Sequence, residues 1–76
     1  MVEAYVTIQT GAGTSQHVVE QLRTLDKVRK ANIVAGDVDV IAEVEADTEQ
    51  SLLQLLSEEI HQIEGVGHTR TCIVLG

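Results

Sequence analysis

Apolar and polar residues alternate along the start of the chain. Between residues 3 and 10, every second position is apolar: Ala4, Val6 and Ile8. A period of two is typical of a β-strand that buries one of its faces. The glycines of the segment 11–13 end this predicted strand, because glycine interrupts a regular strand pattern.

A helical period follows these glycines. Thr14 or Ser15 can cap the start of a helix through its hydroxyl group. Apolar residues then recur at spacings of three and four: Val18, Leu22, Leu25 and Val28. Because this spacing places them on one face of an α-helix, the sequence predicts a first helix that packs against the sheet.

Residues 32–46 predict a β-hairpin. Two β-rich runs flank Gly36 and Asp37. A glycine at the first central position suits a tight primed turn, which matches the twist of the two strands. Aspartate is also common in turns, because its carboxylate hydrogen-bonds nearby backbone.

A second helix is expected after the hairpin. Asp47 and Gln50 have the spacing of a capping box at a helix start. The apolar stripe of this helix consists of Leu52, Leu53, Leu56, Ile60 and Ile63. Gly65 can end the helix in a left-handed conformation, and residues 68–76 form a last β-rich segment.

The predicted element order, β-α-β-β-α-β, is that of a ferredoxin-like sandwich. The sequence thus predicts fold class α+β, with a four-stranded antiparallel sheet and two helices on one face, in one domain over residues 1–76. On the uncovered face we expect apolar groups from Val34, Ile41 and alternate residues of 71–75. Because a chain of 76 residues buries little apolar surface alone, we expect it to dimerise through the sheet.

Charge and composition exclude several classes of protein. Twelve acidic and five basic residues give a net charge of -7, which repels a phosphate backbone, so we expect no direct contact with nucleic acid. Four of the basic residues lie between positions 23 and 30 and are interpreted as a solvated helix end. The single cysteine, Cys72, cannot form an internal disulfide, and no apolar run approaches the roughly 20 residues that span a bilayer. These features predict a cytoplasmic protein that does not enter membranes.

Two acidic residues lie beside the predicted turn. The turn itself explains Asp37, but aspartate is disfavoured inside a strand, so Asp39 needs a partner. Free N–H groups at Gly36 and Val38 beside a carboxylate would offer donors for an anion and an acceptor for a cation, which are the two ends of an amino acid. Two hydroxyl groups from one face of the closing strand are further candidates: Thr69 and Thr71.

Residues 34–56 and 63–75 resemble the effector-binding (RAM) domain of the leucine-responsive, or Lrp/AsnC, regulators. The shared features are short motifs in a common order: Gly-x-x-Asp at 36–39, apolar alternation, a helix, Gly-Val, and Thr-x-Thr at 69–71. Val38 stands where the family often has an aromatic residue. Because the chain begins directly on its first predicted strand, it resembles a stand-alone form of this domain, without a DNA-binding domain.

The resemblance implies an amino-acid-sensing regulatory domain. In such a domain, homodimers assemble into rings of the octamer or decamer class, and a small amino-acid effector binds at dimer–dimer contacts. Regulation is then exerted in trans, on full-length Lrp/AsnC regulators or on other partners. Carried over residue by residue, the resemblance implies these ligand-binding residues: Gly36, Asp37, Val38, Asp39, Thr69 and Thr71.

Two other functions stay open, namely a structural oligomerisation module without a ligand and a small α+β-barrel enzyme. The sequence shows no nucleophile and base at an informative spacing, so we do not expect an enzyme. His17, His61 and His68 lie at no metal-ligand spacing. Gln16 stands where a phosphate loop beginning at Gly11 would need its third glycine. We therefore expect neither a metal nor a cofactor.

Overall fold

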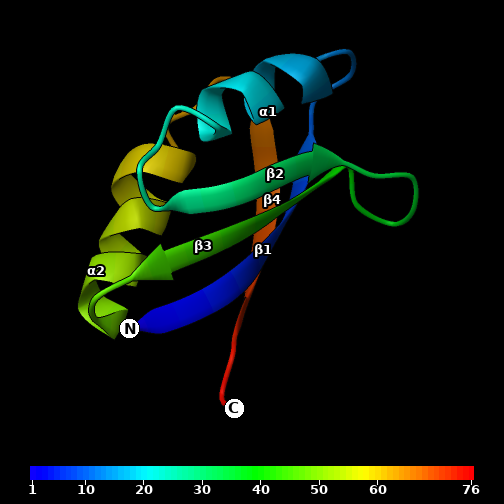
Figure 1. The fold of residues 1–76 in the computed structure, drawn as a ribbon. Coiled ribbons are helices and arrows are strands. Elements are labelled where there is room, and N and C mark those ends of the chain that lie inside the picture. The colour runs from blue at the N-terminus through cyan, green and yellow to red at the C-terminus, as the bar shows by residue number, and fades with distance from the viewer.

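A computed structural model describes residues 1–76 and shows a four-stranded antiparallel sheet with two helices on one face (Figure 1). The strands are β1 (Val2–Thr10), β2 (Val28–Ile33), β3 (Val40–Ala46) and β4 (Val66–Ile73). The helices are α1 (Ser15–Leu22) and α2 (Glu49–Gln54), and α2 continues into a π-helical segment, η1 (Leu55–Ile60). The strand order is β2-β3-β1-β4. The predicted α+β, ferredoxin-like topology is confirmed.

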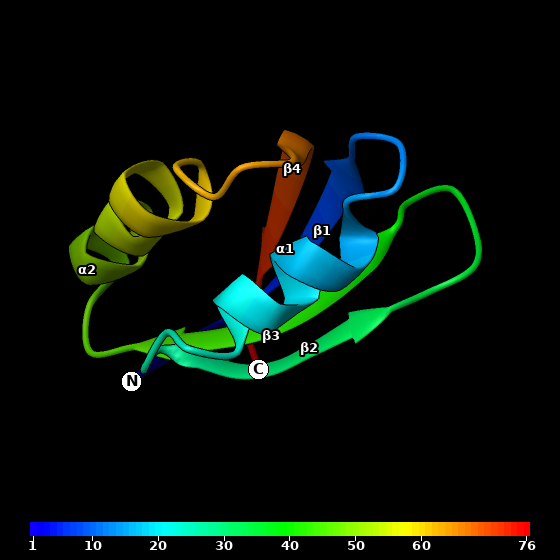
Figure 2. The same cartoon turned by 90° about the horizontal axis from the view of Figure 1, so that it is seen from above.

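The two helices cover the sheet unevenly, as the view from above shows (Figure 2). Helix α1 packs on β2 and β3, and α2 packs on β3. Strand β4 pairs with β1 along one edge, and its residues are exposed or only half-buried. Neither helix is long and apolar enough to cross a membrane. Strand β4 is therefore the part of the sheet that this chain shields least.

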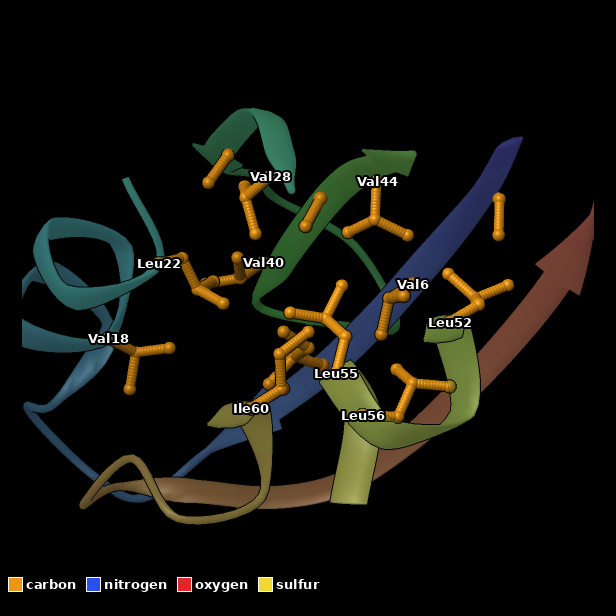
Figure 3. Close-up of a cluster of buried hydrophobic side chains, with 14 of the residues drawn as sticks. Val6, Val18, Leu22, Val28, Val40, Val44, Leu52, Leu55, Leu56 and Ile60 are labelled. Atoms are coloured by element: carbon orange, nitrogen blue, oxygen red, sulfur yellow. The ribbon is translucent and has the colours of Figure 1, made fainter. Parts of the chain in front are cut away.

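The core between the helices and the sheet is entirely apolar. It contains 16 buried residues and no buried polar side chain. Strand β1 contributes Ala4, Val6 and Ile8, and β3 contributes every second residue from Val40 to Ala46, as the alternation predicts. Figure 3 shows side chains of both helices, among them Leu22 and Leu55, directed at these strands. Since each buried Val, Leu or Ile contributes about 1.5–3 kcal/mol, this layer is the main source of stability.

The first helix is shorter than predicted. It ends at Leu22, and Val28 is the first residue of β2 rather than a helical residue. After the helix, the Arg23 guanidinium donates from Nε and Nη2 to the Ala31 carbonyl, at 3.1 and 2.8 Å. The apolar spacing continues through the turn because Leu25 and Val28 contact the same core from a different backbone conformation. Apolar periodicity alone therefore does not distinguish one long helix from a shorter helix followed by a turn and a strand.

The second helix begins and packs differently from the prediction. Its N-cap is Thr48 rather than Asp47, and the Thr48 hydroxyl accepts a hydrogen bond from the Ser51 N–H at 3.0 Å. Leu53, predicted to be in the apolar stripe, is 57% exposed, whereas Leu55 is fully buried. The buried residues Leu52, Leu55, Leu56 and Ile60 have the i, i+3, i+4, i+8 spacing of one helical face, and Leu53 lies outside that face.

The open face of the sheet is less apolar than predicted. Val34 lies beyond β2, in the loop that leads to β3. Ile41 is on the open side of β3, and Cys72 lies opposite Tyr5 on the same side. The remaining positions on this face include two ion pairs, Arg29–Glu45 at 3.4 Å and Lys30–Glu43 at 3.9 Å. The face is thus a mixed surface with a few apolar groups.

Gly65 joins two ends of the fold. Its φ of 100° lies in the left-handed region, as predicted. Its carbonyl accepts a hydrogen bond from the Gly11 N–H at 3.0 Å, which ties the turn before β4 to the loop after β1. A Cβ atom added at this position would lie 2.8 Å from Cβ and Oγ1 of Thr14. Both the conformation and the close approach require glycine here.

Replacing Gly65 with alanine should destabilise the fold. We expect Gly65→Ala to lower the free energy of unfolding by at least about 1–3 kcal/mol, the cost of a strained backbone conformation. Urea unfolding followed by circular dichroism at a fixed protein concentration measures this change. Gly36→Ala is the matched control, because its Cβ would meet no atom within 4 Å, and its effect should stay within about 0.5 kcal/mol. Equal losses in both variants would contradict the role of Gly65.

Candidate functional site

The segment between β2 and β3 is a loop rather than the predicted two-residue turn. Strand β2 ends at Ile33 and β3 begins at Val40, and Gly36 does not have a positive φ. The primed turn is therefore wrong. The loop is closed at its base by a hydrogen bond from the Val34 N–H to the Asp39 carbonyl, at 2.9 Å. Residues 34–39, called the β2–β3 loop below, project beyond the end of the sheet (Figure 1).

Asp39 connects this loop to β1. Its backbone N–H donates to the Ile8 carbonyl at 3.0 Å, and its carboxylate Oδ2 accepts from the Thr10 N–H at 2.8 Å. The regular pairing of β1 with β3 ends at Ile8 and Val40. Beyond this pair, the Asp39 carboxylate accepts the hydrogen bond from the Thr10 N–H that a backbone carbonyl would accept in a continuing strand. This partner explains why an aspartate is favourable immediately before β3.

The predicted loop residues lie beside a groove on the open face of the sheet. The groove has a volume of about 510 Å³. It is lined by Thr7 and Gln9 of β1, by Asp37 and Val38 of the loop, and by His68, Arg70 and Cys72 of β4. A volume of this order is typical of small-molecule sites, which range over about 300–1,000 Å³.

Two hydrogen bonds shape the groove. The Gln9 side-chain amide donates to the Asp37 carbonyl at 3.4 Å, which holds the loop beside β1. The Thr7 hydroxyl donates to the Arg70 carbonyl at 3.5 Å, across the β1–β4 pair. These bonds connect β1 to both β4 and the β2–β3 loop, and all three segments line the groove.

The groove contains one cation and one anion that have no partner within the chain. The Arg70 guanidinium and the Asp37 carboxylate take part in no ion pair and no side-chain hydrogen bond, since both ion pairs of the chain involve other residues. A guanidinium binds a carboxylate well, often through two parallel hydrogen bonds. A carboxylate accepts hydrogen bonds from an ammonium group. The arrangement can therefore receive both ends of a zwitterion.

Thr69 and Thr71 lie on the opposite face of the sheet from this groove. In the β1–β4 register they face Ile8 and Val6, whose side chains are buried on the helix side. The Thr69 hydroxyl is within 2.8 Å of Nε2 of His61, which follows η1. Within one chain, the structure does not bring the two threonines together with the loop. Their role in ligand binding stays a prediction.

Sequence reasoning missed five residues of the groove: Thr7, Gln9, His68, Arg70 and Cys72. The signal that could have found them is the strand alternation itself. Residues 68, 70 and 72 share the face that Thr69 and Thr71 do not use. The Thr-x-Thr motif alone does not indicate which face of β4 lies nearer the loop.

A second hollow, of about 480 Å³, lies at the β2 edge of the sheet. Its lining residues are Arg23, Arg29, Lys30, Ala31 and Asn32. All three cations in it already have partners, because Arg23 binds a backbone carbonyl and the other two pair with glutamates. No group of three or more His, Cys, Asp or Glu side chains lies close enough to hold a metal ion. The groove beside the β2–β3 loop is thus the better candidate for a ligand.

The sequence matches the Lrp/AsnC ligand binding domain family over residues 3–76. The HTH-type transcriptional regulator PF0250 of Pyrococcus furiosus is 32% identical over 60 residues, which cover 79% of this chain and 40% of the relative. The chain spans about 40% of the length of the curated relatives that it matches. The crystal structure of FFRP-DM1 is 35% identical, with a TM-score of 0.95, and the match covers 99% of this chain and 100% of that one. Escherichia coli AsnC is 25% identical, with a TM-score of 0.93 and coverage of 99% and 51%.

The chain is a ferredoxin-like sheet with a groove of about 510 Å³ beside a projecting loop. The family match covers nearly the whole chain, and the solved relatives share its fold throughout. The chain belongs to the Lrp/AsnC family, as a ligand-binding domain of that family of transcription regulators.

Removing the Asp39 carboxylate should destabilise the end of the sheet. We expect Asp39→Ala to lower the free energy of unfolding by about 1–3 kcal/mol, because the part-buried Thr10 N–H loses a charged acceptor. Asp37→Ala removes an exposed carboxylate with no partner in the chain and should change stability by less than about 0.5 kcal/mol. Urea unfolding of both variants separates these effects. A loss in Asp39→Ala no larger than in Asp37→Ala would refute the structural role of Asp39.

Proposed function

We propose that this chain is an amino-acid-sensing regulatory domain, which binds a small amino-acid effector and modulates transcription regulators or other partners in trans. The observation that carries the proposal is the pair of unpartnered charges, Arg70 and Asp37, that line one groove. An amino acid presents one carboxylate and one ammonium group, which match these two charges. The regulatory role is supported by the family, whose curated relatives are HTH-type transcriptional regulators. The site of action we propose is the cytoplasm.

The proposed assembly is a homodimer through the open face of the sheet, with dimers joined into rings. Lrp/AsnC family members are oligomeric regulators that bind amino-acid effectors. A second copy laid on the open face would cover Tyr5, which is 46% exposed, together with Ile41 and Cys72, so the groove that Cys72 lines would lie at the contact between the two subunits. The loop at one end of this face would then contribute to contacts between dimers. In such an assembly, Thr69 and Thr71 of one subunit can reach an effector bound by another subunit.

One observation favours a second function, a structural module that assembles without a ligand. Asp39 is the acid that the sequence could not explain as part of a turn, and its carboxylate is occupied by the Thr10 N–H. This hydrogen bond orders the end of the loop next to β1. This order is also what a loop needs when its only task is to contact another subunit.

We propose no catalytic activity for the groove. His68 and Cys72 both line it, and an imidazole beside a thiol is the one pair here that could activate a nucleophile. They are four residues apart on one strand, which corresponds to roughly 13 Å at about 3.3 Å per residue. That separation is too large for a hydrogen bond between them, so the groove lacks an activated nucleophile.

Calorimetric titration with the twenty standard amino acids tests the proposed function. The assembled protein should bind one or a few of them and leave them chemically unchanged, as an NMR spectrum of the mixture would show. A structural module should bind none, and an enzyme should consume its ligand. Absence of heat with every amino acid at millimolar concentration would refute the sensing function.

Mixing this protein with a full-length Lrp/AsnC regulator from the same cells tests action in trans. Because the domains of the two proteins share one fold, their dimer surfaces should be compatible, and native mass spectrometry should detect hybrid assemblies. The matched control is an unrelated ferredoxin-like domain of similar size and charge, which should form none. Persistent separation of the two proteins would contradict co-assembly as the route of regulation.

A further inference from the structure

We infer that strand β4, at the edge of the sheet, pairs in antiparallel register with β4 of a second copy of this chain. The contact joins two sheets edge to edge through backbone groups, with a two-fold axis at Thr71. It goes beyond the proposed function, because it needs neither an effector nor the dimer through the open face. It leaves that face uncovered, so one chain can form both contacts, and two different two-fold contacts link dimers into larger assemblies.

The hydrogen bonding of β4 shows which of its backbone groups are free. The Val74 N–H donates to the Glu3 carbonyl at 2.9 Å, and Cys72 lies opposite Tyr5 in the β1–β4 register. In an antiparallel pair, every second residue directs its backbone groups at the neighbouring strand, so those of Cys72 and Arg70 face β1. The N–H and C=O groups of the alternate residues point away from the sheet: Thr69, Thr71 and Ile73. Because β4 is the last strand in the sheet order, no element of this chain pairs with these groups.

The opposite edge of the sheet, strand β2, is protected against pairing. By the same alternation, Ala31 directs its carbonyl outward from β2, and the Arg23 guanidinium occupies this carbonyl with two hydrogen bonds. The β2 register is also irregular between Val28 and Lys30. Covering groups, lysines and irregularities are features by which edge strands avoid pairing with other chains. Strand β4 has none of these features between residues 69 and 73, so it is the edge that is available to another strand.

The distribution of charge favours a second copy as the partner. Two chains with a net charge of -7 each repel one another over most of their surfaces. All twelve acidic residues precede position 65, and residues 65–76 contain one permanent charge, Arg70. Two acidic chains can therefore approach each other at this edge without opposing carboxylates. A basic partner would gain no attraction from an edge that lacks them.

One register of β4 against itself is favoured. A two-fold axis at Thr71 overlaps residues 67–75 of both copies, and it places outward-facing backbone groups opposite each other. Thr71 then lies opposite its own counterpart, and two threonines are a favourable cross-strand pair. An axis at Arg70 would instead place two like charges directly opposite each other, which is unfavourable.

This register also covers apolar side chains that the single chain leaves exposed. Ile73 is 37% exposed and Leu75 is 95% exposed, in a C-terminal segment that extends beyond the sheet (Figure 1). In the proposed pairing Ile73 lies opposite Thr69 of the second copy, and Leu75 lies opposite Gly67. A glycine on a strand permits the close approach of another chain, so the Leu75 side chain has room there.

Charge substitutions at Thr71 test the contact, because this residue is exposed in the single chain and meets its own counterpart in the proposed register. Thr71→Lys alone, or Thr71→Glu alone, places like charges opposite each other and should weaken edge association at least about fivefold. An equimolar mixture of the two variants places opposite charges there and should restore association, in mixed pairs. Native mass spectrometry over a range of concentrations measures both effects.

Thr24→Lys and Thr24→Glu are the matched controls. They add the same charges to another exposed threonine, in the turn after α1, and each should associate within about twofold of the unchanged protein. Unchanged association of the Thr71 variants would overturn the inference. Weakened association that the mixture does not restore would overturn the register with its axis at Thr71.

Hydrogen exchange measured by NMR tests the backbone pairing itself. In the assembled protein, the Thr71 N–H should exchange at least about tenfold more slowly than the outward-facing Ile33 N–H at the protected β2 edge. The Cys72 N–H, which faces β1, is the internal control for an intact strand and should exchange slowly in every variant. Equally fast exchange at Thr71 and Ile33 would overturn the inference.

The possible results separate this inference from the proposed function. If the Thr71 variants and hydrogen exchange behave as expected but no amino acid binds, the edge contact stands and the sensing function falls. If amino acids bind but the Thr71 variants associate as the unchanged protein does, the sensing function stands and this inference falls.

Discussion

The hydrogen bond between the Thr10 N–H and the Asp39 carboxylate determines where the β2–β3 loop lies. Regular pairing of β1 with β3 ends at Ile8 and Val40, and without Asp39 the part-buried Thr10 N–H would lack an acceptor. Because buried backbone groups are nearly always paired, this bond holds the loop at the end of β1. The loop in turn supplies Asp37 and one wall of the groove.

The same end of the sheet is tied at several further points. Thr10 also places its hydroxyl 2.7 Å from that of Ser15, at the start of α1. Gly11 donates to the carbonyl of Gly65, just before β4. The loop, α1 and the start of β4 are therefore all connected through residues 10 and 11. A ligand that binds beside this loop meets a surface that is already ordered, and little further ordering opposes its binding.

Sequence periodicity predicted the elements of this fold but not its loop. The alternation of Ala4, Val6 and Ile8 is a local signal that matches one buried face of a strand, and the structure confirms it. The rule that suggested a primed turn at Gly36 is also local, but the loop is shaped by a bond between Asp39 and a residue 29 positions away. The pattern around the turn indicates that Asp39 needs a partner, but it does not identify Thr10 as that partner.

The candidate site was predicted in part, for a similar reason. Of the residues from Gly36 to Asp39, Asp37 and Val38 line the groove, and a motif contiguous in sequence is enough to find both. Alternation places Thr69 and Thr71 on one face of β4 and residues 68, 70 and 72 on the other. Which of these faces lies beside the loop depends on the register of β4 with β1, which pairs the threonines with Ile8 and Val6.

The separation of the loop from the threonines connects ligand binding to assembly. Within one chain the groove opens on one face of the sheet, and Thr69 and Thr71 lie on the other. If both groups contact one effector, they must come from different subunits, and the site is complete only where those subunits meet. A ligand that binds the assembled state and not the separated subunits stabilises that assembly by mass action. Under the proposed function, effector concentration would then control the degree of assembly.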